Sequence, residues 1–131
     1  MTGTPHRIET STSTMPPGPF AQAYAANGMI FVAGQVAYDQ EKSGPVSDDI
    51  KEQTSKVVGN LRTVLKAAGA DLEDIVKLTC ILPNLPEHYT AFNEAFAQAF
   101  GSHFPARTTV QAGLLGGYLV EIEAIAVAPN S

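Results

Sequence analysis

The segment SDDIKEQTSKVVGNLRTVLKAAG, residues 47–69, is the most strongly patterned stretch of this 131-residue chain. Mostly apolar residues recur in it every three or four positions, which is the spacing of one face of an α-helix. Ser47 is a suitable N-cap, the two aspartates after it favour the positive end of the helix dipole, and Gly69 is a natural C-terminal stop. The pattern therefore predicts a helix over residues 47–68. Its core-facing stripe is Ile50, Thr54, Val57, Val58, Leu61, Val64, Leu65 and Ala68.

Shorter patterned segments lie on both sides of this helix. Alternating residues bounded by Gly, Pro and Asn are typical of strands. Asn27-Gly28 between two apolar runs predicts a hairpin turn. Gly34 inside one run predicts a β-bulge or a close approach of ligand to backbone. The expected strands cover residues 6–10, 21–26, 29–36, 73–82, 106–112 and 118–127, and a second helix covers residues 86–100.

The resulting order, β-β-β-α-β-α-β-β, predicts the fold class. We expect an α+β domain in which one mixed six-stranded sheet carries two helices on one face. The other face of the sheet needs a cover, and oligomerisation supplies it most simply. Residues 1–16, rich in Ser, Thr and Pro, are expected to form a flexible N-terminal extension, and residues 17–131 a single domain.

Composition excludes several classes of function. The chain has 13 acidic and 8 basic residues, a net charge of −5, and its basic residues are scattered. Nucleic-acid binding usually needs a basic face, so no nucleic-acid partner is expected. No apolar run is long enough to span a membrane or to form a secretory signal, so we expect a cytoplasmic protein. The single cysteine, Cys80, excludes an intrachain disulfide, and the three isolated histidines suggest no metal site.

Three polar side chains are candidates for chemistry. Arg107 begins a strand and offers a planar fork that fits a carboxylate, although an isolated Arg more often makes a structural ion pair. Glu121 and Glu123 share one face of the apolar strand LVEIEAIAVA, where a carboxylate is either functional or part of a polar edge. Asn93 lies one position from the stripe of the second helix, where it faces a cleft or simply borders the core.

Segments spread over residues 17–127 resemble the reactive intermediate deaminase family, RidA, also called YjgF. Each segment is short, and the resemblance is specific because of their combined order and spacing. The matching segments are GPFAQA (18–23), FVAGQ (31–35), QT (53–54), NL (60–61), AAG (67–69), DIVK (74–77), FN (92–93), FPART (104–108) and VEIEAIA (120–126).

The resemblance implies a chorismate-mutase-like fold. It also implies a homotrimer with a central barrel and an active site in each cleft between subunits. The implied reaction is hydrolysis of reactive 2-imino acids, or their enamine tautomers, to 2-oxo acids and ammonia. The expected partner is therefore a small imino acid, and the family implies neither a metal nor another cofactor.

Carried over residue by residue, the resemblance gives four positions a role. Arg107 matches the arginine that binds the substrate carboxylate, and Glu121 matches the carboxylate that positions or activates the attacking water. Asn93 matches an asparagine that lines the site, and Gly34 matches a backbone contact. A bidentate Arg would fix the electrophilic carbon, and a carboxylate within reach could orient the water and pass a proton to the leaving amine.

Three substrate-binding positions depart from the best-known members of the family. Phe20 stands in place of Tyr, Ala33 in place of Ser, and Thr109 in place of Cys. The loss of polar groups fits a more apolar substrate, a weak deaminase, or a dedicated imine-processing step. It also fits a non-catalytic module that binds small carboxylates. RNA cleavage, attached to some members of the family, is disfavoured by the acidic balance.

Overall fold

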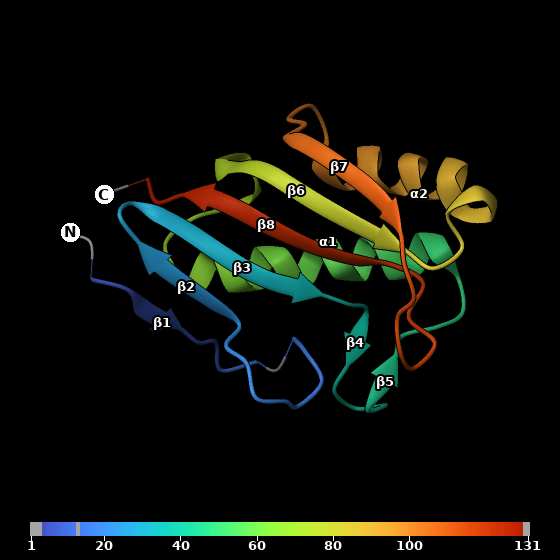
Figure 1. Ribbon diagram of the computed structural model, residues 1–131, viewed down its shortest axis with the longest axis horizontal. Helices are drawn as coiled ribbons and strands as arrows, with labels where there is room; N and C mark the ends of the chain where they lie inside the picture. The colour runs from blue at the N-terminus through green and yellow to red at the C-terminus, as the bar shows by residue number, and fades with distance from the viewer. Residues whose placement is uncertain (1–3, 13, 130–131) are drawn as a thin grey trace.

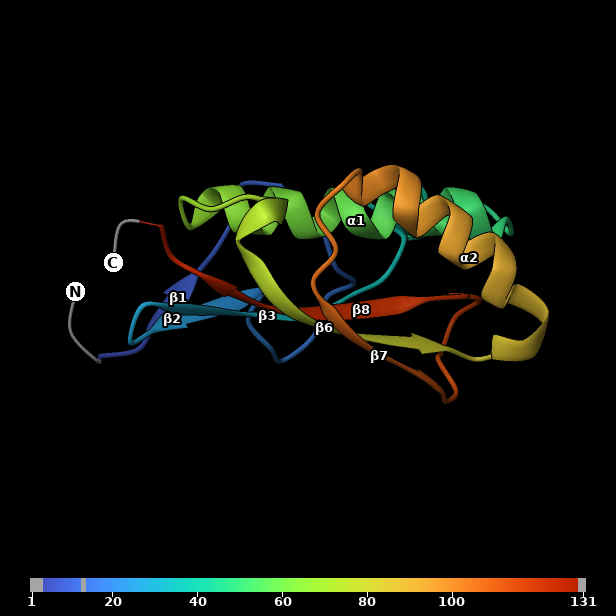
Figure 2. The same ribbon diagram turned by 90° about the horizontal axis from the view of Figure 1, so that it is seen from above.

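The structure, a computed structural model, describes residues 4–12 and 14–129. A six-stranded sheet carries two long helices on one face (Figure 1), and the edge-on view shows the opposite face uncovered (Figure 2). We call this uncovered side the open face. The elements are β1 (His6–Ile8), β2 (Ala23–Ala26), β3 (Met29–Gln35), β4 (Tyr38–Asp39), β5 (Gly44–Pro45), α1 (Ile50–Ala67), the 3-10 helix η1 (Leu72–Asp74), β6 (Ile75–Leu82), α2 (Leu85–Phe100), β7 (Ala106–Gln111) and β8 (Glu121–Val127).

The strand order of the sheet is β1-β2-β3-β8-β6-β7. β6 and β7 are parallel and are joined through α2, whereas the other neighbouring strands are antiparallel. The predicted α+β fold, a mixed six-stranded sheet with two helices on one face, is confirmed. A short β4–β5 ladder forms where the sequence indicated only a loop. The order leaves β7, the strand that carries Arg107, at one edge of the sheet.

The core lies between the sheet and the two helices. β8 runs through the middle of the sheet, and its residues Ile122, Ala124 and Ala126 are buried towards the helices. Its alternate residues Glu121 and Glu123 point to the open face, because successive side chains of a strand point to opposite faces. The core stripe of α1 is buried as its spacing predicted, except that Ala68 follows the helix and is only partly buried.

The N-terminus of α1 differs from the prediction by three residues. The helix begins at Ile50, and the side chain of Asp49 accepts a hydrogen bond from the backbone N–H of Glu52 at 2.9 Å. Ser47 instead accepts a hydrogen bond from the N–H of Asp49 in the turn before the helix. A carboxylate at the N-cap satisfies the free N–H and also interacts with the helix dipole, so Asp49 is the better cap.

The predicted hairpin turn is present, and so is the bulge that was one of the two alternatives for Gly34. Asn27 and Gly28 join β2 to β3 with φ of 53° and 76°, the left-handed conformation that a tight hairpin turn requires. In β3, the pairing with β8 shifts register between Val32 and Gln35, so that an extra residue is accommodated at Ala33 and Gly34. The bulge lies beside the first residue of β8, Glu121.

The N-terminal segment contributes the edge strand β1, which pairs with β2, and Thr14 and Met15 are buried. The division of the chain at residue 17 stays a prediction, and residues 1–3 and 13 of the expected extension lie outside the described residues. In the described ranges 4–12 and 14–129, neither helix is long and apolar enough to cross a membrane.

Candidate active site

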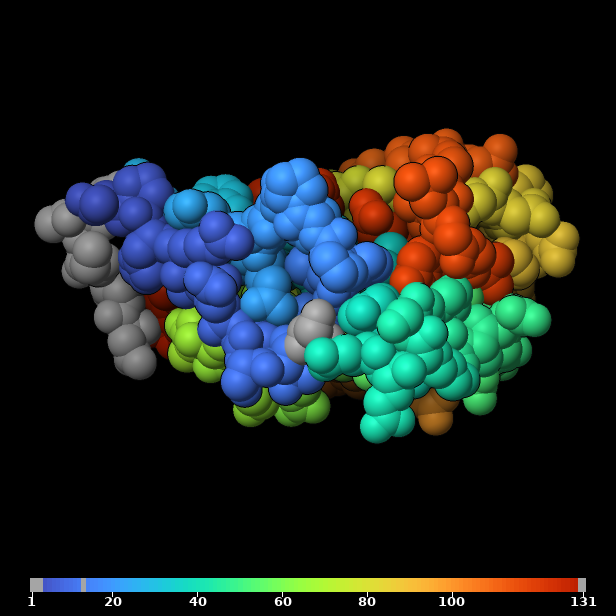
Figure 3. Space-filling view, turned by 90° about the horizontal axis from the view of Figure 1, so that it is seen from below, coloured from blue at the N-terminus to red at the C-terminus, as the bar shows by residue number. Residues whose placement is uncertain are grey.

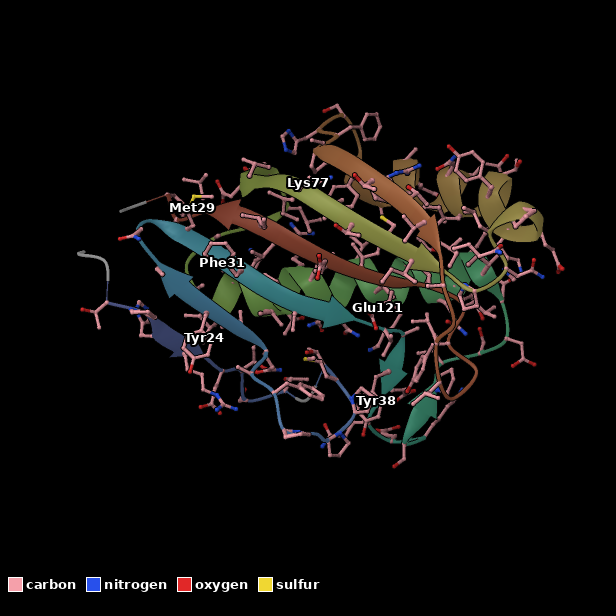
Figure 4. All side chains as sticks on the ribbon, in the orientation of Figure 1. Tyr24, Met29, Phe31, Tyr38, Lys77 and Glu121 are labelled. Carbon is pink, nitrogen blue, oxygen red and sulfur yellow. The ribbon has the colours of Figure 1, made fainter. Side chains whose placement is uncertain are left out.

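Glu121 occupies the first position of β8, opposite Ile81 of β6. Its side chain is half-buried on the open face (Figure 4), where β3 ends beside it. Burial, and to a smaller extent the charge of Glu123, raises the pKa of the Glu121 carboxyl above its ordinary value. A carboxyl with a raised pKa can take up and release a proton closer to neutral pH, as general acid-base chemistry requires.

Gly34 gives Glu121 the space for this position. A Cβ atom at residue 34 would lie 2.5 Å from Oε2 and 2.7 Å from Cδ of Glu121. The carboxyl therefore rests against the bulged backbone of β3. The sequence left open whether Gly34 marked a bulge or a close approach of ligand to its backbone. The bulge is present, and the side chain that approaches this backbone is Glu121.

Glu121 lines a groove with a volume of about 780 Å³. Its walls come from residues 15–20 before β2, the bulge of β3, residues 43–45 and the loop 113–118. Figure 3 shows the surface where the N-terminal segment, the residues around 43–45 and the loop before β8 meet. The predicted residues Phe20, Ala33 and Gly34 line the same groove. Four of the seven sequence-based candidates therefore lie together.

Arg107 lies elsewhere, on the edge strand β7 in register with Leu78 of β6. Its side chain points to the helix-covered side, and the guanidinium carbon is 5.2 Å and 4.9 Å from the ring centroids of Phe92 and Phe96 on α2. Within residues 4–12 and 14–129, no carboxylate pairs with it and it donates no hydrogen bond. Two aromatic rings thus hold the cation while its hydrogen-bonding edge stays unpaired.

Thr109 and Asn93 lie on the same two elements as Arg107. Thr109 follows Arg107 by two residues on β7, so both side chains point to the same face. Asn93 follows the ring-bearing Phe92 on α2, and both Asn93 and Thr109 are half-buried. Within one chain, the candidates thus form two groups, and the sheet lies between the carboxylate of Glu121 and the guanidinium of Arg107.

Cys80 is the only thiol of the chain and lies on β6 opposite Thr109. Burial raises the pKa of this thiol to about 12, and the positive charges of Arg107 and Lys77 offset burial only in part. A protonated thiol is a poor nucleophile, so Cys80 acts as a core residue. Within residues 4–12 and 14–129, no cluster of three His, Cys, Asp or Glu side chains could hold a metal ion.

Two buried amides of α1, Gln53 and Asn60, belong to the segments that match the family, but the sequence analysis gave them no role. Gln53 and Asn60 are 0% and 5% exposed, and their hydrogen bonds reach segments that line the groove. A further signal was present, because they fall three and ten residues after Ile50 and so at the border of the core-facing stripe. They were given no role because a polar residue at the border of such a stripe is usually expected to face solvent.

A family model described as Endoribonuclease L-PSP matches residues 10–128 of the chain. The chain belongs to this family. The family match also confirms the resemblance to RidA and YjgF. Relatives of the chain bear the names RutC family protein and 2-iminobutanoate/2-iminopropanoate deaminase.

Individual relatives cover nearly the whole of this L-PSP family chain. A RutC family protein of Pyrococcus abyssi is 42% identical over 120 residues, which are 91% of this chain and 94% of the relative. The human 2-iminobutanoate/2-iminopropanoate deaminase is 37% identical over 111 residues, covering 84% of this chain and 80% of the relative. The structure of Escherichia coli TdcF with bound serine has a TM-score of 0.85 and 30% identity, covering 93% and 98% of the two chains.

Proposed function

We propose that this L-PSP family chain hydrolyses reactive 2-imino acids, or their enamine tautomers, to 2-oxo acids and ammonia. The observation that carries the proposal is the guanidinium of Arg107, held on two rings without a carboxylate partner in the described ranges. Arg stays charged at all physiological pH values, and a half-buried cation is stabilised by a bound anion. The planar fork of Arg fits the carboxylate of an imino acid. The names of the deaminase relatives support the same reaction.

The reaction adds one water molecule across the C=N bond. Glu121 accepts a proton as the water oxygen bonds to the imine carbon, and the nitrogen is protonated in the resulting tetrahedral adduct. The C–N bond then breaks and ammonia leaves. The carbonyl of the 2-oxo acid forms as the hydroxyl of the adduct gives its proton to the Glu121 carboxylate. The raised pKa makes the Glu121 carboxylate a stronger base towards the water than an ordinary carboxylate. Arg107 holds the carboxylate so that the electrophilic carbon meets the water.

The two groups of candidate residues would meet between subunits of a homotrimer. In one chain, Glu121 faces the open side and Arg107 the helix-covered side at the sheet edge, so a complete site needs Arg107 from one subunit and Glu121 from its neighbour. The open face also exposes large apolar side chains, including Tyr24 at 43% and Phe31 at 46%, and both are visible on it (Figure 4). A clustered apolar surface of this kind is typical of an interface.

The test generates the imine in situ with an amino-acid oxidase and follows its capture by semicarbazide, which competes with hydrolysis. Wild-type protein should lower semicarbazone formation and speed the release of ammonia. Arg107→Ala should lose about 100-fold or more in kcat/KM, because carboxylate binding and substrate orientation are both removed. Arg62→Ala is the matched control, since Arg62 is exposed and pairs with Asp71 away from the groove.

Three results would contradict the proposal. The first is a folded wild-type protein that hydrolyses none of several imino acids, and the second is an Arg107→Ala variant as active as Arg62→Ala. The third is thermal stabilisation by small carboxylates without turnover, which would favour a binding module instead. The groove supplies a reason to test the binding module, because Phe20 and Ala33 line it at the two positions where the best-known members of the family carry Tyr and Ser.

A further inference from the structure

Gln53 connects helix α1 to the loop in front of Glu121. Its Nε2 donates hydrogen bonds to the backbone oxygens of Ser47 at 2.8 Å and Gly117 at 3.2 Å. Its Oε1 accepts a hydrogen bond from the backbone N–H of Leu119 at 2.8 Å. Leu119 stands two residues before Glu121, so one fully buried amide fixes the chain immediately before the proposed catalytic carboxyl.

Asn60 makes the equivalent connection two turns further along α1. Its Nδ2 donates to the backbone oxygen of Val36 at 3.0 Å and to that of Thr14 at 3.3 Å. Val36 lines the groove, and Thr14 immediately precedes Met15, which also lines it. The two amides therefore hold different walls of the same groove from the core side.

A buried amide that loses its hydrogen-bond partners reduces the free energy of unfolding, whereas an apolar side chain would fill the same space without this cost. A buried amide is therefore expected to have a specific role. Thr54, the other buried polar residue of this stripe, bonds only to Ile50 within the helix. Gln53 and Asn60 differ from Thr54, because they bond to residues in or beside the groove walls that lie 24 to 66 positions away in the sequence.

We propose that Gln53 and Asn60 are positioning residues for the candidate active site, with Gln53 setting the place of Glu121 through the loop 113–119. Only the effect on turnover rests on the proposed deaminase function. The placement of Glu121 is a separate property that can be measured without substrate. A purely structural role would make the amides contribute to folding without a specific effect on Glu121.

The test compares Gln53→Met with a control on the same helix. Met has a similar volume but makes none of the three hydrogen bonds, so the loop 113–119 should loosen and admit water to Glu121. Val64→Ala is the control, because Val64 is fully buried on α1 but lines no wall of the groove. Melting temperatures are measured first, so that the two variants are compared at similar losses of stability. If Gln53→Met does not fold, Gln53→Asn replaces it, since it keeps an uncharged amide that is one methylene too short for the same hydrogen bonds.

The first measurement is an NMR titration of the Glu121 carboxyl, assigned with Glu121→Gln. Burial raises this pKa, so water entering the groove should lower it towards the ordinary value in Gln53→Met but not in Val64→Ala. Neither variant alters Glu123, the charged residue that acts on Glu121. An unchanged pKa in the Gln53 variant would overturn the proposal whatever the activity.

The second measurement is the pH dependence of imine hydrolysis. Gln53→Met should lose about tenfold or more in kcat, and the limb that reports Glu121 should move to lower pH. Val64→Ala should keep its profile. Equal losses with unmoved profiles in both variants would mean that Gln53 acts only on stability. If wild type hydrolyses no imine, the deaminase proposal fails, while the NMR titration still decides whether Gln53 positions Glu121.

Discussion

Glu121 shares one face of β8 with Glu123, and this pair gives a prediction for a single residue. The raised pKa of Glu121 comes first from burial and second from the charge of Glu123. Glu123→Gln removes the second cause only. The pKa of Glu121 should therefore fall but stay above its ordinary value, and the acidic limb of kcat/KM against pH should move to lower pH. Glu73→Gln, an exposed change on η1, is the control, and an unmoved limb in Glu123→Gln would contradict the assignment to Glu121.

Gly34 gives a second prediction at the scale of one residue. The Cβ of Gly34→Ala would meet the end of the Glu121 side chain, which can turn aside more easily than backbone can. We therefore expect a small change in melting temperature but a loss of about 100-fold in kcat/KM, because the carboxyl leaves its place. Both quantities are measured on the same preparation.

Gly59→Ala is the matched control for Gly34→Ala. Gly59 lies inside α1, and a Cβ there would meet no atom within 4 Å. Alanine should raise the free energy of unfolding by about 1 kcal/mol, because it favours the helix over the unfolded chain, and should leave activity unchanged. Full activity in Gly34→Ala would contradict the close packing of Glu121 on this backbone.

At the scale of elements, Asp71 joins the end of α1 to η1. Its carboxylate is 3.0 Å from both Arg62 Nε and Lys66 Nζ of α1, and it caps η1 through the N–H of Leu72. Burial acts to raise the pKa of Asp71, but the bond from Leu72 and the two cations together lower it. Because the folded-state pKa is lowered, Asp71 stabilises the protein above its unfolded-state pKa. That stability is lost as the pH falls through the folded-state pKa.

Asp71→Ala should therefore reduce the free energy of unfolding by about 1–2 kcal/mol at pH 7. The difference from wild type should shrink as the pH is lowered through the acid range in which Asp71 becomes protonated. Urea unfolding at several pH values measures both effects. A difference that does not vary with pH would show that the carboxylate charge contributes nothing.

At the scale of the whole molecule, the opposite positions of Arg107 and Glu121 predict complementation between subunits. Arg107→Ala and Glu121→Ala should each be inactive and trimeric by light scattering. After unfolding and refolding together in equal amounts, random mixed trimers should regain up to about a quarter of wild-type activity, because one interface in four joins an intact Arg107 to an intact Glu121. Refolding each variant alone is the control, and a mixture that stays inactive would place the two residues in the same subunit's site.

Some of this architecture follows from local pattern. The stripe of α1, the alternation of β8 and the turn at Asn27-Gly28 each depend on neighbours in sequence, so their periodicity and conformational preferences predicted them. The predicted N-cap of α1, Ser47, was wrong, because Asp49 is an equally good cap two residues further on. The glycine of β3 was correctly associated with a bulge for the same local reason, whereas the side chain resting on it could not be inferred.

What the sequence by itself determined is which residues share a face of an element, because that depends only on helical and strand periodicity. The tertiary structure decided which faces meet. Placing β7 at the sheet edge against α2 set Arg107 on two aromatic rings, and placing β8 beside the bulge of β3 set Glu121 over Gly34 on the other side of the sheet. Strand order and helix docking arise from contacts between residues far apart in the chain, and no local pattern in the sequence records those contacts.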